Sequence, residues 1–301
     1  MIIVIGEILI DVFDEYQRIG GAPFNFAFHL KRLGMPVRLL TRIGDDAHGR
    51  DILRLLEKHR FDLGDVQTDP RHPTGTVRVA LDNQGVPRFD IRTEVAYDYL
   101  DLTGVAPVDW RDARMVYFGT LIQRTARAFD QVSRFLAGKG PRAEAFCDIN
   151  LRPPHFHRQS VAASLQHASI LKLNTDELAH IQSSFGGPAR EDRLAEWVLA
   201  HFDIRMLVLT RGARGSTLYT AEKSVSAPTP DNGKVVDTVG AGDAYAAVVA
   251  AGHLHRLPMD AIAGMAAEFA AYICGLPGAV PEDQSVYDIM RRKMEGASNV
   301  R

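Results

Sequence analysis

The chain has 301 residues, of which 46% are hydrophobic and 24% are charged, and its formal net charge is −2. That length and composition suit a globular protein with one large α/β domain or two modest ones. The near-neutral charge excludes a general attraction to nucleic acid or to anionic membranes, so we expect neither as a partner.

The N-terminus and the cysteines indicate a cytoplasmic protein. The first residues are apolar but include Glu7 and Asp11 and lack a basic region, which predicts a strand and not a signal peptide. No apolar stretch reaches the length of a membrane span. Cys147 and Cys274 both lie in apolar strings and are expected to be buried free thiols.

The first third of the chain predicts two strand–helix units followed by a hairpin. Residues 1–9 predict a buried strand, 22–34 a helix, 37–44 a strand and 48–60 a helix. Residues 67–75 are the most loop-like segment. Residues 76–92 then alternate apolar and polar around a turn at 82–85, which predicts a β-hairpin with one wet face.

The rest of the chain alternates short strands with helices. Strands are expected at 113–120, 143–150, 168–174 and 204–212, with helical patterns such as 125–138 and 190–202 between them. Two edge strands at 215–220 and 223–229 and helices at 243–256, 259–275 and 285–296 complete the chain. This alternation predicts a parallel sheet covered on both faces, with the hairpin as an appendage and not a second domain.

Polar side chains gather where the predicted strands end. Ligands of open parallel sheets bind beyond these carboxyl ends, so the edge is the expected site. The residues concerned are Asp11, Asp148, Asn150, Arg152, Asn174, Glu177, Thr210, Arg211, Asp237 and Thr238.

A glycine turn stands directly before the last apolar helices. Gly240, Ala241 and Gly242 precede Asp243, and a helix beginning here would point free N–H groups at an anion. A carboxylate would repel an anion, but it could take a proton from a hydroxyl that attacks a phosphoryl group. The alternative is that Asp243 is only the helix N-cap.

Two stretches resemble the signatures of the ribokinase-like, or PfkB-type, carbohydrate kinases. They are "GGAPFNFAFHLKRLGMPVRLLTRIGDDAHG" at 20–49 and "DTVGAGDAYAA" at 237–247, and "DINLR", "KLNTDEL" and "LTRGARGS" match in order between them. The resemblance covers nearly the whole chain. It implies one kinase domain over 1–301, a three-layer α/β/α fold with a mostly parallel central sheet, and a small β-hairpin lid formed by about 11–20 and 74–97. The short 11–20 segment makes lid closure and a lid-mediated homodimer open questions.

The resemblance also implies the chemistry, which is ATP-dependent phosphorylation of a sugar's primary hydroxyl. Asp243 would be the general base, and the turn of Gly240, Ala241 and Gly242 would hold the transferred phosphoryl group. The other implied contacts are with the sugar (Asp11, Gly21, Asn25, Arg92, Asn150, Arg152), the nucleotide (Asn174, Thr210, Gly212, Gly215), Mg²⁺ through water (Glu177) and a monovalent cation, commonly potassium (Asp237, Thr238).

Several of these positions have a purely structural alternative. Asp11 could cap a strand end, Asn25 could cap its helix, and Asn174 with Glu177 could form an N-terminal capping box. Arg92 could be a solvated charge on an edge strand.

The sequence leaves more than one candidate for the substrate and for the class of function. "GGAP" and "DINLRPP" resemble the fructokinase branch, so fructose is the first candidate. The branch acting on 2-keto-3-deoxygluconate is the second, with Arg92 or Arg152 binding the carboxylate. A non-catalytic sugar or nucleotide sensor is a third. A dehydrogenase does not fit, because Tyr245 replaces the third glycine of its fingerprint and too little chain follows.

Overall fold

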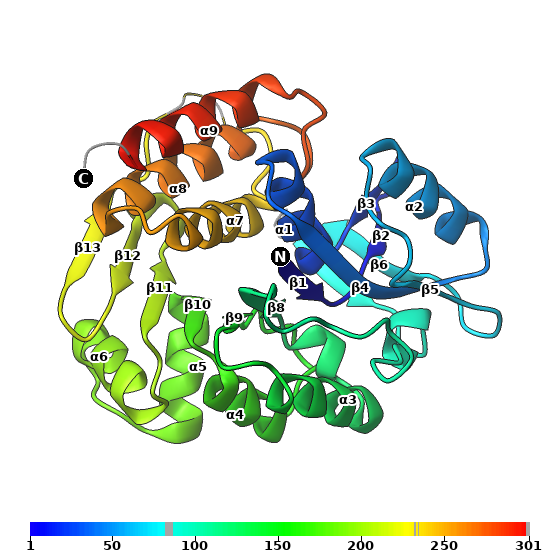
Figure 1. The fold of residues 1–301 in the computed structure, drawn as a ribbon, viewed down its shortest axis with the longest axis horizontal. Helices are drawn as coiled ribbons and strands as arrows, with labels where there is room; N and C mark the ends of the chain where they lie inside the picture. Colours follow the sequence, from blue (N-terminus) through cyan, green and yellow to red (C-terminus); the bar gives the residue numbers. More distant parts are fainter. Residues whose placement is uncertain (82–86, 232, 234, 299–301) are drawn as a thin grey trace.

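The fold is built on a nine-stranded central sheet, seen in a computed structural model that describes residues 1–81, 87–231, 233 and 235–298 (Figure 1). Its strands are β1 (Ile2–Ile5), β4 (Val37–Gly44), β5 (Val66–Asp69), β8 (Met115–Phe118), β9 (Glu144–Asp148), β10 (Ile170–Asn174), β11 (Met206–Thr210), β12 (Ser216–Tyr219) and β13 (Ser224–Ala227). In space they follow the order β13-β12-β11-β10-β9-β8-β1-β4-β5. Only β12 and β13 run antiparallel to their neighbours, so the predicted mostly parallel sheet is confirmed.

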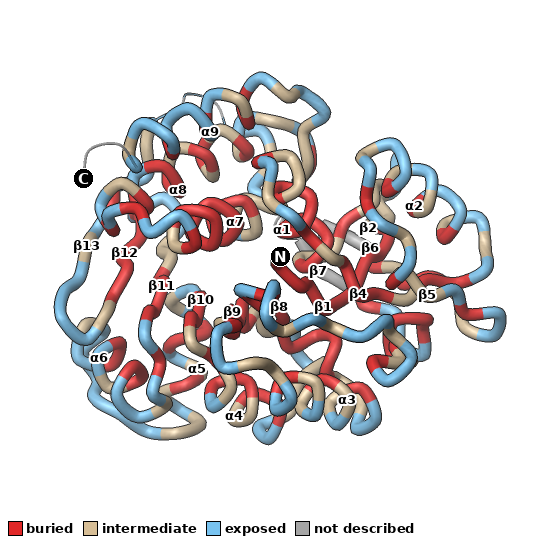
Figure 2. Tube along the Cα trace, viewed as in Figure 1, coloured by how far each residue is buried: buried red, intermediate tan, exposed pale blue. Residues whose placement is uncertain are grey.

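Helices cover both faces of this sheet, as the strand–helix alternation predicts. One layer holds α1 (Ala22–Arg32), α2 (Ala47–Lys58), α7 (Ala241–Leu254) and α8 (Met259–Cys274), with α9 (Ser285–Ser298) packed on α8. The other holds α3 (Ala126–Ala137), α4 (Arg158–His167), α5 (Thr175–Phe185) and α6 (Glu191–His201). The inner strands β1 and β8 are buried at every position, whereas the edge strands β5 and β13 are partly exposed (Figure 2). In β1, Ile2 and Val4 pack against the first layer and Ile3 and Ile5 against the second, which is why the strand is apolar at every position.

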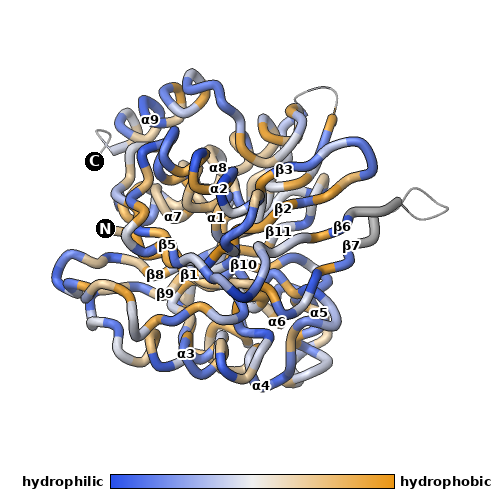
Figure 3. The backbone as a smooth tube through the Cα atoms, turned by 90° about the vertical axis from the view of Figure 1, so that its right-hand side faces the viewer, coloured by the Kyte–Doolittle hydropathy of each residue, from blue (hydrophilic) through white to orange (hydrophobic). Residues whose placement is uncertain are grey.

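A second, four-stranded sheet stands beside the carboxyl ends of the central strands; we call it the small sheet. It consists of β2 (Leu9–Val12), β3 (Gln17–Gly20), β6 (Gly75–Leu81) and β7 (Pro87–Ile91), in the order β3-β2-β6-β7. These strands lie next to one another on the same side of the molecule (Figure 3). The predicted hairpin of β6 and β7 is confirmed, although its turn at 82–85 lies outside the described residues. The parallel pairing of β2 with β6 adds the 9–20 segment to it.

Three local expectations from the sequence are wrong. The strand expected over 1–9 is two strands in two different sheets, so Asp11 lies inside β2 and not at the end of the first strand. The break falls at Gly6, where a Cβ atom would lie 2.2 Å from Cγ of Pro23, so the backbone there packs directly on α1. Residues 67–69, expected as loop, belong to the edge strand β5, whose polar sequence reflects its single neighbour β4. Cys147 is a buried free thiol as expected, whereas Cys274 is only half-buried.

Among the described residues, no helix combines the length and the apolar character that crossing a bilayer requires.

Candidate active site

Most of the predicted site residues line one cavity of about 360 Å³ at the carboxyl ends of the central strands. Its walls come from β9, β10 and β11, from Glu7 between β1 and β2, from the small sheet and from the start of α7. The predicted residues that it brings together are Asp11, Gly21, Asn25, Asn150, Arg152, Asn174, Glu177, Thr210, Thr238, Gly240, Gly242 and Asp243. Positions up to 232 residues apart in the sequence (243 − 11) therefore share one edge of the sheet.

A second cavity, of about 420 Å³, adjoins the first on the far side of the glycine turn. It contains the predicted nucleotide residues Thr210, Gly212 and Gly215, as well as Ala241. Its remaining wall is largely apolar and includes Ala267, Ala270, Ala271 and Cys274 of α8. Thr210, Thr238 and Gly242 line both cavities, so the two meet at the N-terminus of α7.

The turn at this junction requires glycine. Gly240 is the N-cap of α7 and has a φ of 78°, the left-handed region that glycine adopts without strain. A Cβ atom there would also lie 2.2 Å from Cβ of Ala279. The first intrahelical bond of α7 runs from Ala244 N to Gly240 O (2.9 Å), so the amides of Gly242 and Asp243 precede it and face outward. The turn therefore presents free amides at the positive end of a helix, a geometry that suits an anion, and we call it the candidate anion site.

Asp243 is not the N-cap of α7, because Gly240 holds that position and no side chain caps the helix. The capping alternative for Asp243 is therefore wrong. Its Oδ2 instead accepts a hydrogen bond from Nδ2 of Asn25 (2.8 Å), and both side chains line the first cavity. Burial, with the nearby negative charge of Asp148, raises the pKa of Asp243 to about 7. A carboxylate with a pKa near neutrality suits general-base work at cellular pH.

Lys172 forms a buried ion pair with Asp148 beside the turn; the sequence placed Asp148 at the site edge but did not predict Lys172 there. Nζ of Lys172 lies 3.0 and 2.9 Å from the two carboxylate oxygens of Asp148, and both side chains are buried. A Cβ atom on Gly242 would lie 3.4 Å from the same Nζ, which puts a positive charge next to the anion site. Burial opposes the charge on Lys172, but Asp148 and Glu177 outweigh it and raise the pKa of the ammonium. A lysine inside the apolar strand "SILKLN" is the sequence signal that could have revealed it.

Glu7 is a second residue that sequence reasoning did not place in the site. Its side chain is only 4% exposed and lines the cavity, and its Oε2 contacts no hydrogen-bond donor among the described residues. Burial raises the pKa of Glu7 to about 7. The signal was its position, because an acid that directly follows a buried strand must either be solvated or meet a ligand.

Asp11 and Asn25 face the same space from β2 and α1. Asp11 is half-buried, and burial raises its pKa to about 6; Gly20 leaves room for it, since a Cβ there would lie 2.5 Å from its Oδ2. Asn25 donates to Asp243 while its Oδ1 has no donor among the described residues, although it is buried. Asn25 follows the N-cap Gly21 by four residues, so its alternative role as a helix cap is wrong.

Asn174 and Glu177 form the capping box that was the alternative for this pair. Asn174 Oδ1 accepts from the amides of Asp176 and Glu177 (2.9 Å each), and Glu177 Oε2 accepts from the amide of Asn174 (2.8 Å). Glu177 Oε1 accepts from Leu151 N (2.9 Å), and burial raises the pKa of this carboxyl. In the described part of the chain no three acidic, histidine or cysteine side chains converge on a metal position. Glu177 lines the first cavity, and its carboxylate is a hard oxygen donor, a chemistry that suits a magnesium ion held through water.

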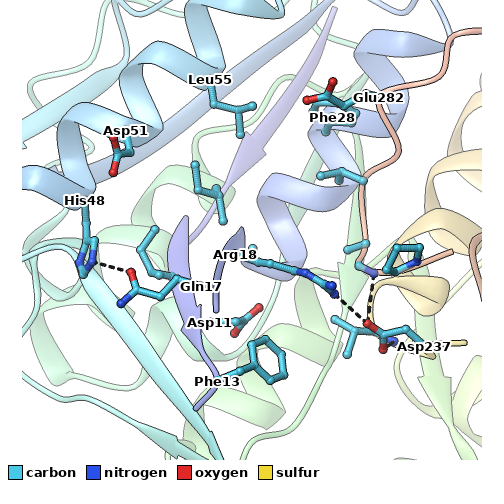
Figure 4. A pocket seen from close by; sticks show the side chains of 18 of the residues that line it. Asp11, Phe13, Gln17, Arg18, Phe28, His48, Asp51, Leu55, Asp237 and Glu282 are labelled. Carbon is cyan, nitrogen blue, oxygen red and sulfur yellow. Dashed lines mark hydrogen bonds and ion pairs between the residues drawn. The ribbon is translucent and has the colours of Figure 1, made fainter. Parts of the chain in front are cut away.

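Three predicted residues lie apart from both cavities, and one of them, Arg211, forms an ion pair with Glu191. The side chain of Arg92 is exposed in a neighbouring hollow that it shares with Asp90, Pro154 and His155. Asp237 lines a third cavity, between the small sheet and residues 277–282, where it contacts Arg18 (Figure 4).

Comparisons with known proteins find a matching family model, curated relatives and similar solved structures. A family model described as pfkB family carbohydrate kinase matches residues 3–284. The fructokinase of Klebsiella pneumoniae is 30% identical over 294 residues, which cover 90% of this chain and 91% of that protein. Among solved structures, a fructokinase from Xylella fastidiosa with bound ATP superposes with a TM-score of 0.85 at 21% identity, covering 98% of each chain. A fructokinase double mutant from Vibrio cholerae O395, bound to fructose, ADP and a potassium ion, gives 0.78 at 21% identity, covering 96% of this chain and 97% of that one.

Proposed function

The chain belongs to the pfkB family of carbohydrate kinases, and on that premise we propose that it transfers the γ-phosphoryl group of ATP to a primary hydroxyl of a ketose, with fructose as the first candidate. The observation that carries the proposal is the meeting of the two cavities at the glycine turn. Asp243 opens to one side of the turn and the apolar wall of α8 to the other. An attacking hydroxyl and a nucleotide can therefore approach the same anion site from opposite sides.

In this proposal the nucleotide occupies the cavity of about 420 Å³. Its base lies against the alanines of α8 and its phosphates point toward Thr210, Gly212 and Gly242. The amides at the start of α7 and the ammonium of Lys172 stabilise the charge of the transferred group. Bound magnesium supplies charge neutralisation to the phosphates, with Glu177 and Asn174 as the residues that would hold it through water.

The sugar occupies the cavity of about 360 Å³, which acts as a set of hydroxyl acceptors. Asp11, Glu7 and the free Oδ1 of Asn25 accept hydrogen bonds from sugar hydroxyls, and Gly21 lets the ring lie against the backbone. Asp243 takes the proton of the primary hydroxyl as its oxygen attacks phosphorus. Asn25 holds the carboxylate in position for this transfer.

The charges in the cavity favour a neutral sugar over a sugar acid. Among the described residues, the acids Glu7, Asp11, Asp148, Glu177 and Asp243 line it together with two cations, Lys172 and Arg152. Lys172 is already paired with Asp148, so Arg152 alone would have to bind a substrate carboxylate. We therefore rank 2-keto-3-deoxygluconate below fructose. We also propose that 1–301 acts as one domain, with the small sheet, larger than a hairpin, as its lid.

The test is an ADP-release assay with fructose, other ketoses, aldoses and 2-keto-3-deoxygluconate. We expect fructose to give the highest kcat/KM, and Asp243→Asn to lower kcat by at least about 10²-fold, the usual scale for a lost general base. Asp260→Asn is the matched control, since Asp260 is an exposed acid in the first turn of α8. A higher kcat/KM for the sugar acid would rule out fructose as the preferred substrate. Failure to turn over any sugar, with a rise in Tm on adding ATP analogue, would favour the sensor.

A further inference from the structure

Arg18 and Asp237 form an ion pair that joins the small sheet to the glycine turn (Figure 4). Nη1 of Arg18, in β3, lies 3.2 Å from Oδ2 of Asp237, three residues before Gly240. The two residues are 219 positions apart, so the fold alone brings them together. Their side chains are 32% and 22% exposed, which keeps the pair largely out of water.

The carboxylate of Asp237 is already supplied with donors. Oδ2 also accepts from Gly278 N (3.1 Å), and Oδ1 accepts from Val239 N (3.0 Å). The bond to Val239 fixes the chain immediately before the glycine turn, so the position of Asp237 is coupled to the anion site. One guanidinium matches the charge of this carboxylate, so Asp237 itself offers no uncompensated negative charge to another cation.

Arg18 is held in place by its surroundings. Its guanidinium lies over the ring of Tyr16, 4.5 Å from the centroid, and 6.0 Å from that of Phe13. Gly278 leaves room for it, because a Cβ there would lie 3.2 Å from Nη1. Stacking, an ion pair and a glycine opposite it together describe a built position for a guanidinium and not a freely moving surface side chain.

The resemblance to carbohydrate kinases implied a monovalent cation at Asp237 and Thr238, and the residues here do not fit one. A bare cation needs oxygen ligands and an uncompensated carboxylate, whereas a fixed positive charge already contacts Asp237. We propose that Arg18 takes the place of this cation, so that the site works without potassium. Arg18 is then a positioning residue that orders the glycine turn through Asp237 and Val239. This inference rests on the proposed kinase function.

The experiment compares potassium chloride with tetramethylammonium chloride at constant ionic strength, using fructose and ATP. We expect wild-type turnover to agree within about twofold in the two salts. Arg18→Met keeps an unbranched side chain against Tyr16 but frees Asp237. Its turnover in tetramethylammonium chloride should be about tenfold lower than that of wild type, the scale of outer-shell substitutions. Potassium chloride should restore most of this turnover. The Tm of Arg18→Met should also rise in potassium chloride, while the wild-type Tm should not.

Arg50→Met is the matched control, because Arg50 contacts Asp45 at 3.8 Å on the surface and both side chains are more than half exposed. It should behave as wild type. A wild-type rate or Tm that rises strongly with potassium would overturn the proposal, and so would an Arg18→Met variant whose rate and Tm ignore potassium. If Arg18→Met does not fold, the wild-type comparison still decides. The Tm measurements do not depend on turnover. Absence of kinase activity would therefore refute the proposed function, while the Tm measurements would still test whether Arg18 replaces potassium.

Discussion

The raised pKa of Asp243 predicts a steep pH dependence of catalysis around neutrality. The base must be ionised to accept a proton, and burial together with Asp148 raises its pKa to about 7. About 1% of a group with that pKa is ionised at pH 5 and about 90% at pH 8, so kcat/KM for the sugar should rise by nearly two orders of magnitude over this range. A carboxyl at the ordinary value of 3.8 would give a flat profile over the same range.

The assay is ADP release at low sugar and saturating magnesium–ATP, from pH 5 to pH 9. Bound phosphates add negative charge near Asp243, so they can move the midpoint only upward. Glu7 has a similar pKa; Glu7→Gln, which does not titrate, should therefore keep the profile of the wild type while lowering affinity for the sugar. A flat profile, or a midpoint below pH 6, would refute the assignment of Asp243 as a buried base. If Glu7→Gln lost the pH dependence, the titrating group would be Glu7 and not Asp243.

Three further predictions concern stability and the turn. In the folded protein the pKa of Glu7 is about 7, above its ordinary value of 4.5. The native state therefore binds the proton more tightly, and the free energy of unfolding falls as pH rises from about 4.5 to about 7. In urea unfolding, the free energy of unfolding of Glu7→Gln should increase relative to that of wild type by up to about 3 kcal/mol between pH 4 and pH 8.5. A difference between the two proteins that does not vary with pH would contradict this. Lys172→Met leaves Asp148 buried and unpaired and should cost about 3–5 kcal/mol. Adding Asp148→Asn should restore the Tm but not turnover, and restored turnover would remove Lys172 from the anion site. Gly240→Ala should lower both Tm and kcat, since φ is 78° and Ala279 fills the space, whereas Gly264→Ala, with nothing within 4 Å in α8, should raise Tm by the helix propensity of alanine.

The sequence predicted the central sheet well because its evidence is local. Apolar strand runs and helical periodicity follow from burial on both faces, and they located eight of the nine central strands, missing the polar edge strand β5. Of the strands in the small sheet only the hairpin was predicted, although the family resemblance assigned 11–20 to the same lid. Its other two strands, β2 and β3, are short and half-exposed, so their sequence resembles that of a loop. The pairing of β2 with β6 joins Leu9 to Gly75, residues 66 positions apart (75 − 9), which no local pattern records.

The sequence by itself identified the family, the glycine turn and Asp243 as the candidate base, because each of these depends on residues that are neighbours within a few positions. Only the tertiary structure decided the partners of that machinery. Asn25 meets Asp243 across 218 residues and Arg18 meets Asp237 across 219. The neutral pKa values of Glu7 and Asp243 likewise come from burial by distant elements. Desolvation and charge contacts depend on distance in space, which a linear pattern does not record.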